Sequence, residues 1–179
     1  LQRALDQVIH DICTMKLPVV LCLDRAGLVG EDGETHHGVF DISFLRMIPG
    51  IEFMAPRDEI ELELMLRYSA KTSGPAIIRY PRGAGTGLSG HERRQIVCGR
   101  SELLRDGSDL AIIPLGSMVQ PTLEAAEMLE KEGIRSRVIN PRFIKPFDRI
   151  ALAEIIRKRM PIVTVEEHAL AGGFGGMIL

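Results

Sequence analysis

Short runs of branched apolar residues alternate along the chain with longer stretches in which apolar positions recur every three or four residues. The short runs have the length and composition of buried β-strands, and the longer stretches have the periodicity of amphipathic helices. Strands are expected at 18–23, 51–55, 75–80, 110–115, 134–139 and 161–165, with a strand or hairpin at 96–104. Helices are expected at 1–15, 40–46, 58–71, 119–131 and 147–158. Strands that alternate with helices predict an α/β fold with parallel sheets.

Several single residues mark the ends of these helices. Pro18 ends the first helix, because a proline disfavours the helical conformation in the residue before it. Asp58 is placed to cap the helix at 58–71, and Gly133 ends the helix at 119–131. The acidic residues at the start of the helix at 58–71 are interpreted as a solvated N-terminal face rather than a metal site. They are Glu59, Glu61 and Glu63.

The segment 24–38 follows the first expected strand and cannot continue it. Glycines at 27, 30, 33 and 38 interrupt any regular period and permit backbone conformations closed to other residues. Polar and titratable residues fill the spaces between them, namely Asp24, Arg25, Glu31, Asp32, Glu34, Thr35, His36 and His37. In open α/β sheets, ligands bind beyond the carboxyl ends of the strands, where this segment begins. A solvated glycine-rich connection is the alternative, but long loops inside compact domains are usually functional or disordered. The pattern therefore predicts a binding or catalytic site here.

Composition narrows the possible functions. Of the 179 residues, 45% are hydrophobic and 26% are charged, which is ordinary for a soluble globular protein. The formal net charge of -2 gives no basic footprint for nucleic acid, and no apolar run approaches a membrane span. Cys13, Cys22 and Cys98 show no paired spacing, so free thiols in a reducing cytoplasm are expected.

The chain begins with Leu1 rather than methionine, and we expect it to be a piece of a longer protein. Residues 84–94 have little apolar periodicity and are interpreted as a linker, with Arg93 and Arg94 as a solvated charge pair. The linker would separate residues 1–83 from residues 95–179.

The segment 24–38, with Phe40-Asp41 and Ile48-Pro49 after it, resembles the 1-deoxy-D-xylulose-5-phosphate synthase family. Enzymes of this family depend on thiamine diphosphate and belong to the transketolase superfamily. The similarity covers essentially the whole chain. It implies two consecutive parallel-sheet domains of the transketolase type, both incomplete: the second half of a pyrimidine-binding domain at 1–83 and the first part of a C-terminal domain at 95–179.

The resemblance implies roles for five residues. His36 matches a histidine that reaches the reaction centre, and imidazole suits proton transfer near neutral pH. Asp32 matches an acidic residue that orients the substrate hydroxyl groups. Arg3, Arg25 and Arg82 match arginines of the acceptor pocket, and a guanidinium offers donors in a fixed fork that suits phosphate. Because Arg25 and Arg82 leave the ends of two different strands, they could converge on one anion.

Other candidate residues receive structural interpretations. His37 falls where the family pattern varies and receives no role. Arg79 lies inside a strand pattern and is expected to form a structural ion pair. The Glu166-Glu167 pair and the later Gly172-Gly173 pair match a similar motif of the family. The glycines permit either the close approach of a backbone or ligand, or tight packing of a helix on a strand.

Parts of the family's cofactor site have no counterpart in the chain. The family places its metal at a Gly-Asp-Gly motif followed by an asparagine, which Glu31-Asp32-Gly33 does not match. The glutamate that activates the cofactor would precede residue 1. The ligands of thiamine diphosphate and Mg²⁺ are therefore expected mainly outside this chain, which alone should be inactive and holds no predicted metal ligand.

The resemblance implies that the full-length enzyme condenses pyruvate with D-glyceraldehyde 3-phosphate and releases carbon dioxide. The product, 1-deoxy-D-xylulose 5-phosphate, would enter isoprenoid, thiamine and pyridoxal biosynthesis. A cytoplasmic homodimer is expected, without nucleic-acid or membrane partners. Two alternatives stay open: another thiamine-diphosphate enzyme, such as transketolase or a 2-oxo-acid dehydrogenase β subunit, and a non-catalytic module that binds sugar phosphates or a protein partner.

Overall fold

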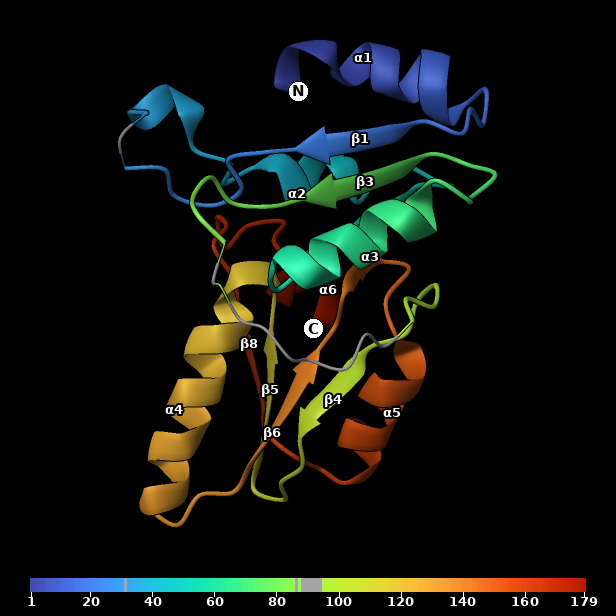
Figure 1. The fold of residues 1–179 in the computed structure, drawn as a ribbon. Helices are drawn as coiled ribbons and strands as arrows, with labels where there is room; N and C mark the ends of the chain where they lie inside the picture. Colours follow the sequence, from blue (N-terminus) through green and yellow to red (C-terminus); the bar gives the residue numbers. More distant parts are fainter. Residues whose placement is uncertain (31, 86, 88–94) are drawn as a thin grey trace.

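The computed structural model describes residues 1–30, 32–85, 87 and 95–179, and it contains two four-stranded sheets (Figure 1). The first sheet has the order β1-β3-β2-β7. Its strands are β1 (Val20–Leu23), β2 (Glu52–Met54), β3 (Ala76–Arg79) and β7 (Phe143–Lys145). Strands β1 and β2 run parallel to β3, so all three point their carboxyl ends to the same edge. Strand β7 is antiparallel to β2.

Three helical segments accompany the first sheet. The N-terminal segment joins a 3₁₀ turn η1 (Gln2–Ala4), a short α1 (Leu5–Gln7) and a π-helical η2 (Val8–Cys13). Its apolar residues Leu5, Val8, Ile9 and Ile12 pack against the core, whereas Leu1 and Ala4 are exposed. Helix α2 is Asp41–Leu45, and α3 is Glu59–Ser69. The predicted cap of α3 is confirmed, because the Asp58 side chain accepts a 2.7 Å hydrogen bond from the backbone N–H of Glu61.

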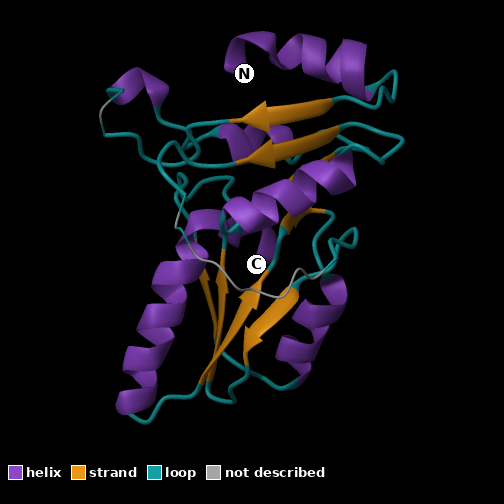
Figure 2. Ribbon diagram, viewed as in Figure 1, coloured by secondary structure: helices purple, strands orange, loops and turns teal. Residues whose placement is uncertain are grey.

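The second sheet has the order β4-β6-β5-β8. Its strands are β4 (Glu102–Arg105), β5 (Leu110–Pro114), β6 (Ser136–Asn140) and β8 (Ile162–Val165). Helices α4 (Val119–Lys131) and α5 (Arg149–Arg157) flank it on opposite sides (Figure 2). The remaining helical elements are the short 3₁₀ turns η3 (Glu34–His36) and η4 (Gly116–Met118) and the short helix α6 (Gly175–Ile178).

Successive side chains of a strand point to opposite faces of its sheet. One face of the first sheet therefore packs against the second sheet in a shared core. Phe53 and Ile77 face a core that also holds Ile113 and Ile139 of the second sheet. Met54 and Ile78 face the opposite way, towards α3. No helix among the described residues is long and apolar enough to cross a membrane.

The predicted α/β fold with mainly parallel sheets is confirmed, but two of its details were not predicted. Both sheets carry an antiparallel edge, because β7 pairs antiparallel with β2 and β4 pairs antiparallel with β6. Strand β7 was not predicted, since it is three residues long, and it joins the first sheet although it comes from the second half of the chain. The expected linker lies largely outside the described residues, as do Arg93 and Arg94.

The interpretation of Glu61 as a solvated acid is wrong. Its side chain is buried and accepts hydrogen bonds from Asn140 at 3.0 Å and from Arg142 Nε at 2.7 Å. Arg142 also donates to Glu102 at 2.7 Å. These buried ionic groups tie α3 to β4 and to the segment between β6 and β7. A buried carboxylate is tolerated because it is both paired and hydrogen-bonded.

Candidate functional site

The segment 24–38 leaves the carboxyl end of β1 and closes into a loop with a narrow neck. The backbone N–H of Gly27 donates to the carbonyl of Gly38 at 3.0 Å, and Gly38 donates back to Gly27 at 2.9 Å. Gly27 has a φ of +80°, a conformation that glycine adopts without steric cost. Gly27 and Gly38 thus form the neck, and the residues between them lie beyond the edge of the sheet.

Asp32 joins two arginines from different strand ends. Arg25 follows β1 and donates from Nε to Asp32 Oδ2 at 2.7 Å. Arg82 follows β3 and donates to the other carboxylate oxygen, Oδ1. The predicted convergence of Arg25 and Arg82 is therefore found, and the group on which they converge here is a carboxylate of the chain itself.

The hydrogen bonds and charges of this cluster favour the ionised forms of Asp32 and Arg25. The hydrogen bond from Arg82 and then that from Arg25 hold the pKa of the Asp32 carboxyl below its usual range. The hydrogen bond to Asp32, with the nearby charge of Asp24, raises the pKa of Arg25. Arg25 also pairs with Asp24, so that two arginines and two aspartates meet at this partly exposed edge.

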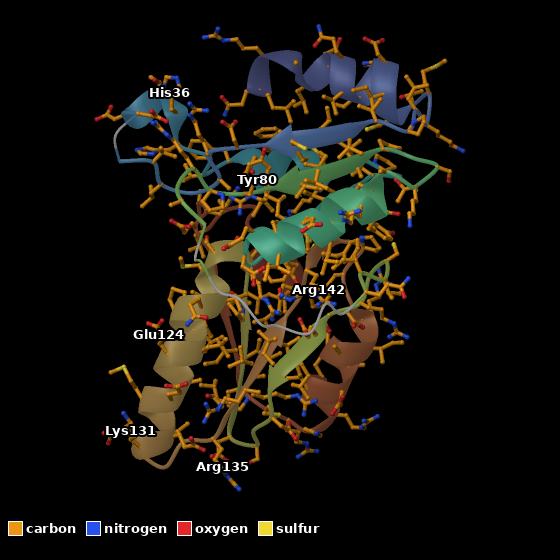
Figure 3. All side chains as sticks on the ribbon, in the orientation of Figure 1. His36, Tyr80, Glu124, Lys131, Arg135 and Arg142 are labelled. Carbon is orange, nitrogen blue, oxygen red and sulfur yellow. The ribbon has the colours of Figure 1, made fainter. Side chains whose placement is uncertain are left out.

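His36 lies on the same loop, at the end of the turn η3. Figure 3 shows it at the outer edge of the molecule, beyond the end of β1. Its Nδ1 lies 3.0 Å from the hydroxyl of Thr35. It lines a cavity of about 480 Å³ together with Asp24 and Arg25. An exposed imidazole beside a cavity is free to meet a ligand.

His37 has a structural task inside the loop. Its Nδ1 accepts a 2.9 Å hydrogen bond from the backbone N–H of Val29. This bond spans the loop and fixes its two sides relative to each other. The sequence assigned His37 no role, and the structure shows that it also lines the cavity that contains His36.

A second cavity of about 430 Å³ borders the cluster on its other side. It is lined by Asp24, Tyr80 and Arg82, by the start of α3 and by residues of η4 and α4. Asp24 lines both cavities, and it also pairs with Arg25. Sequence reasoning gave Asp24 no role, although its position directly before Arg25 at a strand end was a usable signal.

Arg3 is not brought into contact with this cluster. It lies exposed in η1, and its side chain makes no hydrogen bond or ion pair with the described residues. Its neighbours Leu1 and Gln2 do line the cavity that contains His36. The expected role of Arg3 in the acceptor pocket therefore stays a prediction.

Arg79 forms the ion pair expected of it. Its Nε donates to Asp41 at 2.8 Å, and its guanidinium also donates to the carbonyl of Gly38 at 3.1 Å. Only 4% of its side chain is exposed. Arg79 therefore stabilises the neck of the loop at Gly38 from the protein interior, and its buried guanidinium is not available to a ligand.

The segment from Glu166 to Gly175 uses its glycines for packing. Glu166 accepts hydrogen bonds from the backbone N–H groups of Phe174 and Gly175, both at 2.8 Å. A Cβ at Gly173 would lie 2.8 Å from the Glu166 carboxylate. Of the two interpretations left open for this motif, the geometry favours close packing, with Glu166 occupying the space beside the glycines.

The described residues contain no group of three or more His, Cys, Asp or Glu side chains that could hold a metal ion. Within the loop, Asp32 is bonded to two arginines and His37 to the backbone of the loop itself. The donors present here suit a sugar phosphate better than a divalent cation.

Comparison with known proteins places both halves of the chain. Residues 1–86 match the family profile of the transketolase pyrimidine-binding domain, and residues 99–179 match that of the transketolase C-terminal domain. The chain is 54% identical over its whole length to a 1-deoxy-D-xylulose-5-phosphate synthase of Heliobacterium modesticaldum, and 55% identical to one of Thermomicrobium roseum. It spans 28% and 29% of the length of these two curated relatives.

Solved structures agree with the profiles. A structure titled split gene transketolase, inactive beta4 tetramer, matches 98% of this chain and 57% of its own, at 33% identity and a TM-score of 0.87. A transketolase mutant from Pichia stipitis matches 86% of this chain and 24% of its own, with a TM-score of 0.71. At 23% identity, that second likeness concerns the fold alone. With both halves matched in order by transketolase domain profiles, the chain belongs to the transketolase family.

Proposed function

We propose that this chain forms the acceptor-binding part of a 1-deoxy-D-xylulose-5-phosphate synthase. The complete enzyme would condense pyruvate with D-glyceraldehyde 3-phosphate, release carbon dioxide and form 1-deoxy-D-xylulose 5-phosphate. The observation that carries the proposal is the convergence of Arg25 and Arg82 on Asp32 beyond two neighbouring strand ends. The similarity to synthases of that name along the whole chain supports it.

Arg25 and Arg82 would bind the phosphate of the acceptor. Each side chain is partly exposed, at 38% and 45%, so that a ligand can reach both guanidinium groups. A guanidinium carries five N–H donors in a planar fork whose geometry suits phosphate oxygens. Asp32 would hold both arginines in place before the ligand arrives, which reduces the ordering cost of binding.

Asp32 and His36 would act on the rest of the acceptor. A phosphate held between the arginines lets the sugar carbons extend into the cavity beside His36. A carboxylate oxygen of Asp32 can accept a hydrogen bond from a substrate hydroxyl. His36 would move a proton at the oxygen of the reacting carbonyl, and Arg3 would add positive charge near the cavity mouth.

Thiamine diphosphate supplies the carbanion chemistry in enzymes of this type. The ligands of thiamine diphosphate and Mg²⁺ are proposed to lie mainly outside this chain, which spans 28% and 29% of the length of the two synthases it resembles. The proposal also includes the division into 1–83 and 95–179 with a linker at 84–94, a cytoplasmic location and a homodimeric enzyme.

The test is a product assay on the longer protein expected to contain this chain. The purified protein is incubated with thiamine diphosphate, Mg²⁺, pyruvate and glyceraldehyde 3-phosphate, and the products are separated by mass spectrometry. The proposal predicts equal amounts of carbon dioxide and 1-deoxy-D-xylulose 5-phosphate. Residues 1–179 alone should give neither. Turnover by residues 1–179, or no product from the longer protein, would contradict the proposal.

A transketolase activity is the second candidate, favoured by the structural match to a split-gene transketolase at a TM-score of 0.87. That structure is titled an inactive tetramer, which also fits a chain that does not act alone. Transketolase would transfer a two-carbon unit between sugar phosphates and would not use pyruvate. Product formation from two sugar phosphates without carbon dioxide would support this candidate instead.

A further inference from the structure

Three consecutive residues after β8 contact the base of the segment 24–38, which we call the site loop. The backbone N–H of Ala169 donates to the carbonyl of Val39 at 3.0 Å. The buried His168 places its Nε2 3.9 Å from Asp41 Oδ1. Glu167 lies against Gly27, in the neck of the loop. Residues from the second half of the chain therefore support a loop that belongs to the first half.

The contact between Glu167 and Gly27 is close enough to restrict both residues. A Cβ built on Gly27 would lie 2.8 Å from both Cβ and Cδ of Glu167, and 2.9 Å from its Oε2. Gly27 also has the positive φ that other residues rarely adopt. The backbone at Gly27 therefore lies directly against the Glu167 side chain, and there is no room for a side chain at position 27.

Glu167 is held from its other side. Its Oε2 accepts a 2.9 Å hydrogen bond from the hydroxyl of Ser117, in the turn that begins α4. The side chain therefore lies between the neck of the loop and the start of α4. Because Ser117 fixes its carboxylate, the Glu167 side chain can in turn fix the position of Gly27.

His168 strengthens the same support. Its Nδ1 lies 2.8 Å from the carbonyl of Ala169, and its Nε2 is buried without a hydrogen-bond partner among the described residues. Asp41, its nearest anion, is bonded to Arg79, which in turn donates to Gly38. Gly38, on the second side of the neck, is therefore stabilised through successive contacts with Arg79, Asp41 and His168.

We propose that Glu167 is a positioning residue, which holds the neck at Gly27 and Gly38 so that Asp32 and His36 stand correctly in the site. This inference deepens the proposed function, and its kinetic consequences rest on that function. Glu167 does not touch the cluster itself. It acts through the neck, in which Gly27 lies nine residues before His36 and Gly38 lies two residues after it.

Glu166 provides a matched control. It is also a glutamate with a bonded carboxylate, but its two partners are the N–H groups of Phe174 and Gly175, away from the loop. Glu166→Ala should therefore loosen the segment 174–179 and leave the neck unchanged. Glu167→Ala should do the reverse.

The experiment measures amide hydrogen exchange in the longer protein, which requires no activity. Glu167→Ala should speed exchange in 27–38 about 2- to 10-fold, because one hydrogen bond and its packing are lost. Exchange in β5 should not change, and Glu166→Ala should leave 27–38 at the wild-type rate. Unchanged exchange in 27–38 for Glu167→Ala, or an equal rise in both variants, would overturn the proposal.

Kinetics give a second readout. Glu167→Ala should raise KM for the phosphorylated acceptor and lower kcat, while KM for pyruvate stays within about twofold. Glu167→Gln keeps the size and an acceptor for Ser117, so it should restore wild-type values. If Glu167→Ala fails to fold, Ser117→Ala removes only the hydroxyl and should shift exchange in 27–38 in the same direction. An inactive wild-type protein would contradict the proposed function, whereas the exchange data would still decide the role of Glu167.

Discussion

Arg25 Nε lies 2.7 Å from Asp32 Oδ2, and this bond links the first residues after β1 to the far side of the site loop. The other oxygen of the same carboxylate accepts from Arg82, which follows β3. Two strand ends and a loop are thereby joined through one side chain. The arrangement explains how an irregular segment can present defined donors to a ligand.

The ionisation of Asp32 should follow from these bonds. Because Arg82 and Arg25 lower its pKa, the stabilising contribution of the carboxylate is present above its ordinary pKa of about 3.9 and is lost as pH falls through the lower, folded value. The cluster should therefore stay intact as pH falls to that ordinary value and should open only below it. A carbon-13 NMR titration of the Asp32 carboxyl, identified with Asp32→Asn, should show its inflection below about 3.9. An inflection above that value would contradict the bonds described here.

The buried carboxylate of Glu61 should be far more important for stability than its neighbours on α3. Glu61→Ala leaves Arg142 buried with a lost partner, and breaking such a pair costs about 3–5 kcal/mol. Denaturant unfolding of the longer protein would measure the loss. The control is Glu63→Ala, which removes an exposed pair with Arg67 and should cost less than about 0.5 kcal/mol. Similar losses for the two variants would show that Glu61 is not a buried partner.

Glu61 also shows where sequence reasoning fails. Acids at every second position near a helix start resemble a solvated face, and the partner that reverses this, Arg142, is 81 residues away. The contact of Glu167 with Gly27 is equally invisible in the sequence, because it depends on how the two sheets pack. Strand β7 was missed for a related reason, since three residues carry no period and its partner β2 lies far back in the chain.

Local signals succeeded where one residue determines a local conformation. The cap at Asp58 and the end of α4 before Gly133 were predicted and are found. The meeting of Arg25 and Arg82 followed from topology, because adjacent parallel strands end at the same edge. The position of Asp32 between them could not be predicted, since it depends on the path of a glycine-rich loop.

Asp148 should be a strong local contributor to stability. Burial raises its pKa, but hydrogen bonds from Ser101 and Ala151 outweigh this and hold the pKa below the ordinary value. Asp148→Ala should therefore lower the free energy of unfolding by about 1–3 kcal/mol at neutral pH. The difference from wild type should shrink as pH falls through the lowered pKa. The exposed Asp6→Ala is the control and should change little.

His36 should affect the reaction and not the fold. In the longer protein, His36→Ala should lower kcat about 10²- to 10⁴-fold, the usual contribution of a general acid or base. The melting temperature and the affinity for thiamine diphosphate should be nearly unchanged, because His36 is exposed and bonded only to Thr35 among the described residues. His10→Ala, an exposed histidine on the N-terminal helix, is the control. Normal kcat with normal melting would remove His36 from the site.

Arg25 and Arg82 are proposed to bind the phosphate of the acceptor. Losing one charge-assisted hydrogen bond of about 1.5–3 kcal/mol should raise KM for glyceraldehyde 3-phosphate about 10- to 150-fold in Arg25→Ala or Arg82→Ala. The KM for pyruvate should change far less, because pyruvate carries no phosphate. Arg135→Ala is the control, since this exposed arginine lies at the opposite end of the molecule from His36 (Figure 3).

The most direct measurement is the pair of KM values, for glyceraldehyde 3-phosphate and for pyruvate, in wild type, Arg25→Ala, Arg82→Ala and Arg135→Ala of the longer protein. We expect a selective rise in KM for the triose phosphate in the first two variants and wild-type values in the third. The same two variants should discriminate less between the triose phosphate and unphosphorylated glyceraldehyde. Equal losses for pyruvate and for the triose phosphate would contradict the account and indicate that the loop has collapsed.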